Sequence, residues 1–337
     1  MRVARLYGVG DLRVDEEPIV DAPAGHSLVR VTAVGICGSD LHWFAEGGIG
    51  DAGLTVPLVL GHECAGVVEQ GPLAGRRVAI DPAIPCAACE TCRRGWQNLC
   101  PQVRFAGHGV TDGALRDVMA WPDHLLYPLP DGISDVAGAM LEPLGVALHA
   151  VDLGHVRAGG SVAIVGCGPI GLLAIQLVRA VGAATVAAVE PLAHRRRAAV
   201  GFGADLAVTP EQAHAGALED VMASGGVDVA IEIAGTDDAI ALAMHTAAPG
   251  ARVVLAGIPD TDRSSFPASV ARRKGLTILM SRRMNGMYPR TTALVRGGRV
   301  DVEPIVTDRF ELAQVAAAFT AATARAGLKT VVEISRR

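Results

Sequence analysis

A glycine-rich turn in the middle of the chain constrains the fold most strongly. A strand-like apolar run at residues 161–165 leads into Gly-Cys-Gly-Pro-Ile-Gly at 166–171, and residues 170–181 have helical spacing. Glycines at the first, third and sixth positions permit a tight turn, close approach of a pyrophosphate to the helix N-terminus, and close packing of helix on strand. The motif alone is weak in a chain with 40 glycines, but its strand-turn-helix context predicts a dinucleotide-binding unit with Gly166, Gly168, Pro169, Ile170 and Gly171 at the cofactor.

The second half of the chain continues this pattern. Helical segments alternate with further strand-like runs at 185–189, 227–233, 252–258 and 276–280. Alternation of strands and helices predicts a parallel sheet that is covered by helices on both faces.

The first half has a different rhythm. Short β-branched runs at 28–34, 65–68 and 77–80 are separated by Gly, Pro and Asp, which predicts a strand-rich domain with many turns. A helix is expected at 311–322 and a strand at 330–334. Two domains are the expectation for 337 residues, because this length exceeds what one hydrophobic core usually serves.

Composition excludes several classes of partner. Hydrophobic residues make up 50% of the chain, and the formal net charge of −5 creates no general attraction for nucleic acid or anionic lipid. The longest apolar stretches, at 162–165 and 171–178, are too short to span a bilayer, and the N-terminus lacks the pattern of a secretory signal. We therefore expect a cytoplasmic protein with neither a nucleic-acid nor a membrane partner.

Four of the seven cysteines crowd into fifteen residues. Cys86, Cys89, Cys92 and Cys100 have the spacing C-x2-C-x2-C-x7-C, in which tight turns can direct four thiolates at one tetrahedral metal. A closed shell of four thiolates predicts a structural zinc; an iron–sulfur cluster is the alternative, although its usual cysteine spacing differs.

A second candidate metal site is dispersed along the chain. Cys37 lies in Gly-Ile-Cys-Gly-Ser-Asp-Leu-His, and His62 and Glu63 follow in Gly-His-Glu. Thiolate, imidazole and carboxylate all bind zinc, and an incomplete shell leaves room for an alcohol oxygen whose pKa the metal lowers. Taken singly, each residue has an ordinary alternative as a buried thiol, a core histidine or a surface charge.

The order of these motifs resembles the medium-chain zinc-dependent alcohol dehydrogenases over nearly the whole chain. Cys-Gly-Ser-Asp at 37–40 and Leu-Glu-Pro at 141–143 are similar to the sorbitol and polyol dehydrogenase branch. The resemblance implies an α/β fold with a GroES-like β-rich catalytic domain at 1–143 and 283–337, and a Rossmann domain with a doubly wound parallel sheet at 144–282. It also implies a homodimer or homotetramer.

The same resemblance implies roles for individual residues. Cys37, His62 and Glu63 would hold a catalytic zinc, with Glu142 at the edge of its shell, and Asp40 would orient the histidine ligand. Ser39 would bond the substrate hydroxyl and pass its proton outward, and His42 would link that relay through the cofactor ribose to solvent. A helix cap for Ser39 and a partly exposed helix histidine for His42 are the plain alternatives.

The choice of nicotinamide cofactor depends on two opposing signals. Glu190 ends the second strand nineteen residues after Gly171, where a carboxylate can bond the adenosine ribose and repel a 2′-phosphate. Arg195 and its two arginine neighbours could instead bind a phosphate, although an adenine-side contact suits Arg195 equally. The carboxylate favours NAD over NADP.

These inferences predict an NAD-linked dehydrogenase with two zinc ions per chain, one catalytic and one structural. By resemblance, its substrate is a small polar alcohol such as a polyol, sugar acid or cyclitol, whose secondary hydroxyl becomes a ketone. A threonine or simple secondary-alcohol dehydrogenase of the same family is the alternative, and a catalytically inactive nucleotide-binding relative is a remote one.

Overall fold

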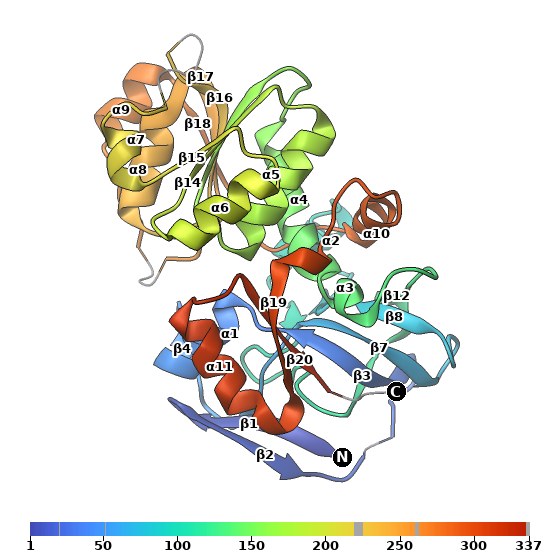
Figure 1. Cartoon of the computed structure of the whole chain (residues 1–337). Coiled ribbons are helices and arrows are strands. Elements are labelled where there is room, and N and C mark those ends of the chain that lie inside the picture. Colours follow the sequence, from blue (N-terminus) through green and yellow to red (C-terminus); the bar gives the residue numbers. More distant parts are fainter. Residues whose placement is uncertain (20, 51, 219–224, 260–262, 335–337) are drawn as a thin grey trace. The chain divides into compact units, whose positions relative to one another are not determined.

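The computed structural model describes residues 1–337 except 20, 51, 219–224, 260–262 and 335–337. The chain divides into two compact units (Figure 1). Unit 1 comprises Met1–Glu142, Asn285–Arg296 and Val302–Arg337, and unit 2 comprises Pro143–Met284 and Gly297–Asp301.

Unit 2 is built on a parallel six-stranded sheet. Its strands follow the spatial order β15-β14-β13-β16-β17-β18. The strands are β13 (Ser161–Val165), β14 (Thr185–Val189), β15 (Leu206–Val208), β16 (Val227–Glu232), β17 (Ala247–Leu255) and β18 (Thr277–Met280). The order reverses between β13 and β16, and such a switch point is where open parallel sheets bind ligands, at the carboxyl ends of their strands. The sheet thus confirms the predicted doubly wound α/β fold.

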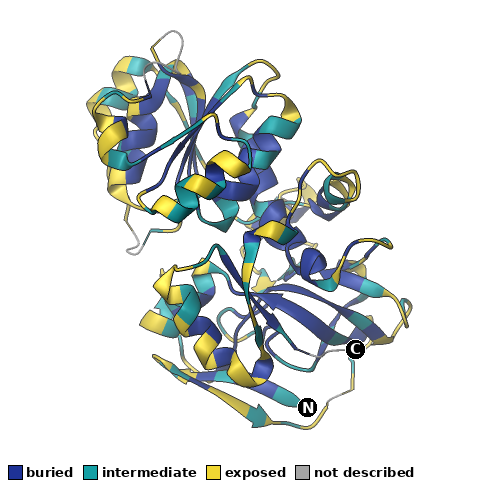
Figure 2. Ribbon diagram, in the orientation of Figure 1, coloured by how far each residue is buried: buried dark blue, intermediate teal, exposed yellow. Residues whose placement is uncertain are grey.

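Helices cover both faces of this sheet (Figure 1). They are α5 (Pro169–Val181), α6 (Ala193–Gly201), α7 (Pro210–His214), α8 (Asp237–Thr246) and α9 (Ala268–Lys274). Helix α5 begins with Pro169 at its first position, where a missing N–H costs nothing, and ends at Gly182 in the left-handed conformation. The central strands β13 and β14 are almost wholly buried and lie in the dark blue interior of this unit in Figure 2, which accounts for their continuous apolar runs.

Unit 1 is mainly antiparallel. Its largest sheet has seven strands in the order β12-β8-β7-β3-β20-β19, with β11 also paired to β3. Their bounds are β3 (His26–Gly35), β7 (Glu63–Gln70), β8 (Arg77–Ile80), β11 (Val118–Pro122), β12 (Leu126–Pro128), β19 (Val306–Glu311) and β20 (Lys329–Glu333). A three-stranded sheet in the order β2-β1-β6 contains β1 (Arg2–Gly8), β2 (Asp11–Glu16) and β6 (Leu58–Val59). The remaining short strands are β4 (Gly48–Ile49), β5 (Ala52–Gly53), β9 (Ala83–Ile84) and β10 (Arg104–Phe105).

The end of the chain returns to complete unit 1. Strand β20 pairs antiparallel with β3, so the red C-terminal segments lie beside blue N-terminal strands (Figure 1). The expected helix at 311–322 is only partly correct. Glu311 ends β19, residues Leu312–Gln314 form a short 3-10 turn, and α11 covers Val315–Ala324. Gln314 Oε1 accepts the backbone N–H of Glu311, and this local cap begins the 3-10 turn, so the α-helix starts four residues later than expected.

The other helices of the chain are α1 (Gly38–Glu46), α2 (Glu90–Arg93), α3 (Asp135–Ala139), α4 (Leu141–Gly154) and α10 (Tyr288–Arg296). The stretch Asp135–Gly154 is long and apolar enough to cross a membrane by length and composition alone, but 83% of its window is buried inside the protein. Core helices of globular proteins pass the same test.

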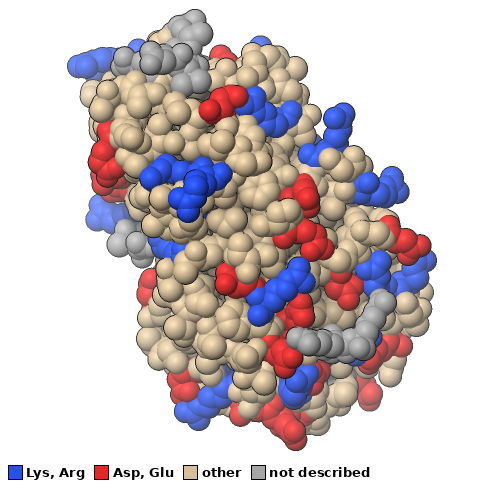
Figure 3. Space-filling model, in the orientation of Figure 1, with Lys and Arg blue, Asp and Glu red and all other residues tan. Residues whose placement is uncertain are grey.

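On the face drawn in Figure 3, basic and acidic side chains are interspersed.

Candidate active site

Helix α1 begins at the first predicted zinc ligand. Cys37 is the N-cap residue, with extended backbone angles, and Asp40 one turn later accepts its backbone N–H at 2.9 Å through Oδ2. This bond satisfies a donor at the helix start and stabilises the negative charge of Asp40 there. The other oxygen of Asp40 accepts the backbone N–H of Gly61 at 3.1 Å. Asp40 therefore links the start of α1 to the loop that carries His62.

Asp40 also faces the imidazole of His62. The distance from Asp40 Oδ1 to His62 Nδ1 is 3.4 Å, and both side chains are buried. Burial lowers the pKa of His62, but Asp40 and Cys37 outweigh it and raise this pKa well above its ordinary value. Burial likewise acts to raise the pKa of Asp40, yet His62 and the two backbone donors hold it below its usual value. The Asp40 carboxylate therefore orients the His62 ring through Nδ1, and Nε2 stays available as the metal ligand.

Glu63 has a buried partner that sequence reasoning missed. Lys329, the first residue of β20, places its Nζ against Glu63 Oε2 and donates to the carbonyl of Ile36 at 2.8 Å. The lysine and glutamate side chains are 2% and 1% exposed. Burial lowers the pKa of Lys329, but the neighbouring carboxylate raises it above the usual value. The one available signal was that Lys329 is one of only two lysines in the chain.

Cys37, His62 and Glu63 come together although they are separate in sequence. One ligand atom from each lies within 4.8 Å of the others. This spacing suits three ligands of one ion with bond lengths of about 2.0–2.3 Å, and the mixed sulfur, nitrogen and oxygen set suits zinc. Three protein ligands leave a coordination position open for substrate or water, as catalytic zinc sites require.

Glu142 lies in the same buried region. It is the second residue of α4 and is 4% exposed. Burial raises its pKa to about 8; the charge of His62 opposes this shift, and that of Glu63 adds to it. Among the described residues, the three-ligand cluster does not include Glu142, so its predicted place at the edge of the shell stays a prediction.

The two candidate relay residues stand on the same helix. Ser39 Oγ is 3.4 Å from His62 Nε2, whereas His42 Nδ1 is 3.0 Å from Glu46 Oε1. Phe105 packs on the His62 ring with centroids 5.1 Å apart. The site thus combines charged ligands with an aromatic wall.

The four-cysteine lobe forms a second cluster in unit 1. Its sulfurs lie within 4.8 Å of one another, with Cys86–Cys92 at 4.0 Å and Cys89–Cys100 at 3.9 Å. A tetrahedral zinc with bonds of about 2.3 Å has sulfur–sulfur edges of about 3.8 Å. Backbone N–H groups of Ala88 and Cys89 lower the pKa of Cys86 to about 6, which favours the thiolate that zinc binds. All seven cysteines are free thiols, and the lobe fits one zinc ion with a closed shell.

The predicted cofactor turn joins β13 to α5. Gly166 has a φ of 98°, and a Cβ at Gly171 would lie 2.0 Å from the carbonyl oxygen of Gly166. Side chains at these positions would strain or separate the turn. Because these positions carry no side chain, a diphosphate can approach the backbone N–H groups at the start of α5.

Glu190 is bound to this turn. Its Oε2 accepts the backbone N–H of Cys167 at 2.8 Å, and its Oε1 accepts that of Leu192 at 2.9 Å. The carboxylate is therefore held rigidly next to the glycine turn, with lone pairs remaining for a ligand. Arg195 lies at the same turn, because a Cβ on Gly168 would be 3.7 Å from its guanidinium nitrogen.

A second carboxylate in this region was missed. Glu232 ends β16 at the switch point, is fully buried, and accepts the backbone N–H of Gly235 at 2.6 Å. Burial raises its pKa. The available sequence signal was a charged residue near the end of the apolar run at 227–233.

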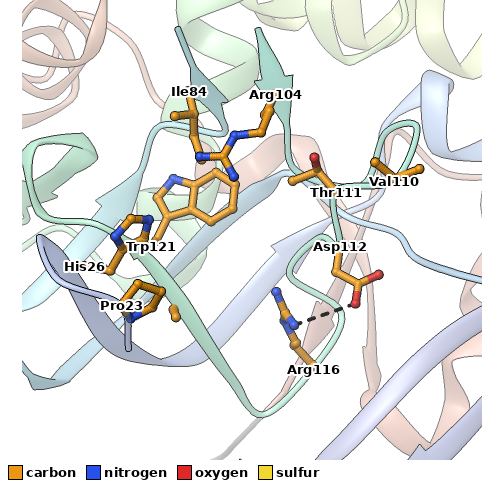
Figure 4. A pocket seen from close by; sticks show the side chains of 10 residues that line it. Pro23, His26, Ile84, Arg104, Val110, Thr111, Asp112, Arg116 and Trp121 are labelled. Atoms are coloured by element: carbon orange, nitrogen blue, oxygen red, sulfur yellow. Dashed lines mark ion pairs between the residues drawn. The ribbon is translucent and has the colours of Figure 1, made fainter. Parts of the chain in front are cut away.

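A separate cavity of about 370 Å³ opens on unit 1 (Figure 4). It contains none of the predicted ligands or relay residues. Asp112 and Arg116 form an ion pair in its lining at 4.0 Å, and Trp121 forms part of its wall. The cavity is therefore distinct from the metal cluster.

Comparison with known proteins agrees with this geometry. Residues 23–131 match the alcohol dehydrogenase GroES-like domain, and residues 169–296 match the zinc-binding dehydrogenase family. The probable D-xylulose reductase A of Neosartorya fischeri is 35% identical over 97% of this chain and 95% of its own. The sorbitol dehydrogenase of Bacillus subtilis is 32% identical over 93% and 91%.

A solved structure has the same fold. The zinc-binding dehydrogenase of Sinorhizobium meliloti bound to NADP has a TM-score of 0.89 and 32% identity, with 99% of both chains covered. Full-length similarity to these relatives confirms both the predicted family and the predicted fold. The chain belongs to the medium-chain zinc-dependent alcohol dehydrogenases, in their polyol dehydrogenase-like branch.

Proposed function

We propose that this chain is an NAD-linked zinc dehydrogenase that oxidises a secondary hydroxyl of a polyol, sugar acid or cyclitol to a ketone. The observation that carries the proposal is the cluster of Cys37, His62 and Glu63 within 4.8 Å, an incomplete zinc shell in the same unit as a closed four-cysteine shell. One zinc would bind at each cluster. The relatives named for xylulose and sorbitol chemistry support a small, polyhydroxylated substrate.

When bound, zinc would activate the substrate hydroxyl, and the nicotinamide would accept the hydride from the carbon that bears this hydroxyl. The residues of the chain provide the remaining steps. Ser39 accepts the hydroxyl proton as it donates its own, and His42 carries it toward water. Asp40 keeps Nδ1 of His62 engaged, so that Nε2 remains a ligand. Glu142 supplies a buried carboxyl beside the cluster.

The preference for NAD depends on Glu190. Its carboxylate is held at the glycine turn by two backbone N–H groups, where it would bond the ribose hydroxyls and repel a 2′-phosphate. Arg195 would contact the diphosphate or adenine side. NADP in the Sinorhizobium meliloti relative makes this a specific point to test. A clear preference for NADP in initial-rate measurements would refute the role of Glu190.

A cofactor-reduction screen tests the substrate class. Sugar alcohols, sugar acids, cyclitols, threonine and short secondary alcohols are compared by the rate of NADH formation. We expect polyhydroxylated substrates to give the highest kcat/KM. Highest activity on threonine or 2-propanol would support the alternative dehydrogenase within the family.

Metal analysis tests the mechanism and the inactive alternative. Cys37→Ala is expected to reduce zinc from two ions per chain to one and to abolish turnover, with NADH binding retained. Unchanged turnover would contradict the catalytic role of Cys37. One zinc per chain in the native protein would instead favour the inactive nucleotide-binding relative.

The proposal extends to organisation and location. Residues 1–143 and 283–337 would form the catalytic domain, residues 144–282 the NAD-binding domain, and the protein would act in the cytoplasm. We infer a homodimer or homotetramer. Strand β18 supports this inference, because it is an edge strand of its sheet and ends at Met280, which is 72% exposed. Pairing with a second copy would cover that edge.

A further inference from the structure

One face of α1 leads from the metal cluster toward solvent. Ser39, His42 and Glu46 occupy positions i, i+3 and i+7 of this helix, which project from the same side. Ser39 Oγ lies 3.4 Å from His62 Nε2. The His42 side chain is 18% exposed and that of Glu46 is 52% exposed. Exposure therefore increases from the cluster outward along this face.

The outer two residues share a hydrogen bond. His42 Nδ1 and Glu46 Oε1 are 3.0 Å apart. A carboxylate accepts hydrogen bonds and donates none, so Nδ1 carries the proton in this pair. In the neutral ring, Nε2 then keeps its lone pair and is the nitrogen that can accept a proton.

Two elements that pack on α1 contain no charged residue that could compete with Glu46 for His42. The elements that pack most closely on α1 are β4 and α11. Within their described residues, β4 contains only Gly and Ile, and α11 contains only Val, Ala, Phe and Thr. On α1 itself, Asp40 is committed to backbone donors and His62. His108 meets α1 through an edge contact with the buried Trp43, at a centroid distance of 5.3 Å.

We propose that Glu46 is a positioning residue that holds His42 in the Nδ1–H tautomer for proton transfer; this rests on the relay role of His42 in the proposed function. The proton that leaves the alcohol by way of Ser39 is accepted at Nε2. The imidazolium then has a proton on each nitrogen, Glu46 still accepts the Nδ1–H, and Nε2 releases its proton to water. The two electrons of the broken C–H bond leave separately with the hydride to nicotinamide.

Nitrogen NMR of ¹⁵N-histidine-labelled, zinc-loaded enzyme tests the tautomer directly. We expect the native His42 ring to show protonated Nδ1 and unprotonated Nε2, and Glu46→Ala to shift the population toward Nε2–H. His42→Gln assigns the signals by removing them. Glu69→Ala is the matched control, because Glu69 is 43% exposed and ion-paired to Arg30 at 3.1 Å. The same His42 pattern in native protein and Glu46→Ala would overturn the proposal.

Kinetics test whether Glu46 acts through His42. Glu46→Ala should lower kcat about threefold to tenfold, part of the roughly 10²–10⁴-fold that a general acid or base contributes. Glu46→Gln keeps an acceptor oxygen and should recover most of this loss. Added to His42→Gln, Glu46→Ala should cause no further loss. If the two losses multiply, Glu46 acts elsewhere and the proposal fails. If His42→Gln alone leaves kcat unchanged, the relay in the proposed function fails, and the claim that Glu46 positions His42 for proton transfer fails with it.

Discussion

At the residue scale, both lysines of this arginine-rich chain direct their amino groups at oxygen atoms, Lys329 in the buried interior and Lys274 at a partly exposed position. Lys274 Nζ donates to the carbonyls of Met244, His245 and Ala247 at 3.3, 2.5 and 2.7 Å, at the end of α8. Lys329 bonds the carbonyl of Ile36 and pairs with Glu63. A compact ammonium with three donors suits such oxygen-lined sites, whereas a planar guanidinium fits them poorly.

Removal of the Lys329 charge should destabilise the protein through Glu63. Lys329→Met leaves a buried carboxylate without its partner, which costs about 3–5 kcal/mol in comparable pairs. We expect a corresponding fall in the free energy of unfolding in urea once the catalytic zinc has been removed by a chelator, because Lys329 is then the partner that the structure gives Glu63. Lys329→Met combined with Glu63→Gln should regain much of this loss. Equal stability of the single and double variants would contradict the coupling.

A pH effect is expected from Asp81. Burial raises its pKa to about 6, against the weaker opposing effect of the Ala83 backbone N–H. Between the unfolded pKa near 3.8 and about 6, the folded state binds more protons, so stability contributed by this group falls as pH rises. Asp81→Asn removes this penalty. Its stability gain over native protein should be about 1 kcal/mol larger at pH 8 than at pH 5 in urea unfolding. A pH-independent difference would contradict the assignment.

At the element scale, local pattern identified the parallel sheet of unit 2 better than the helices of unit 1. Strands β13 and β14 have the predicted bounds, because buried parallel strands are continuous apolar runs flanked by turn residues. Helix α1 was expected only through the plain alternatives for Ser39 and His42, since its N-cap is a cysteine and its nine residues show little apolar periodicity. The contacts of Asp40 with Gly61 and His62 reinforce this helix start, and they are tertiary.

The turn between β13 and α5 yields a prediction for cofactor affinity. A methyl group at Gly171 would lie 2.0 Å from the Gly166 carbonyl oxygen and would push α5 away from the turn. Gly171→Ala should weaken NADH binding at least about tenfold in a fluorescence titration, because the backbone donors at the helix start are displaced. Zinc content should remain unchanged.

Gly201 offers a matched control for this substitution. It lies in α6, and a Cβ at this position would meet nothing within 4 Å. Gly201→Ala should leave NADH affinity unchanged and favour the helix slightly. Native affinity in Gly171→Ala would show that the turn tolerates a side chain.

At the scale of the whole molecule, the candidate metal ligands and the candidate cofactor-binding residues belong to different units. Both metal clusters lie in unit 1, and the glycine turn, Glu190 and Arg195 lie in unit 2. Unit 1 takes residues from three separate parts of the chain. Loss of a metal site should therefore affect the stability of unit 1 without changing the residues that bind nucleotide.

Substitution in the cysteine lobe tests this separation. Cys92→Ser removes one of four thiolates from the closed shell, and structural zinc supplies folding free energy. We expect zinc to fall from two ions per chain to one and the Tm to fall, while NADH affinity is retained. Cys64→Ala is the control, because Cys64 is buried in unit 1 but belongs to neither cluster. Two zinc ions in Cys92→Ser would contradict the assignment.

The sequence by itself determined the family, the alternation that makes the parallel sheet, and the two groups of metal-binding residue types. These features depend on local spacing: four cysteines within one lobe, and glycines between one strand and one helix. Only the tertiary structure decided that Lys329 pairs with Glu63 and that Asp40 also accepts the backbone N–H of Gly61. The first of these contacts joins residues far apart in sequence. Their geometry depends on how β20 pairs with β3 and how α1 is positioned, which no local pattern specifies.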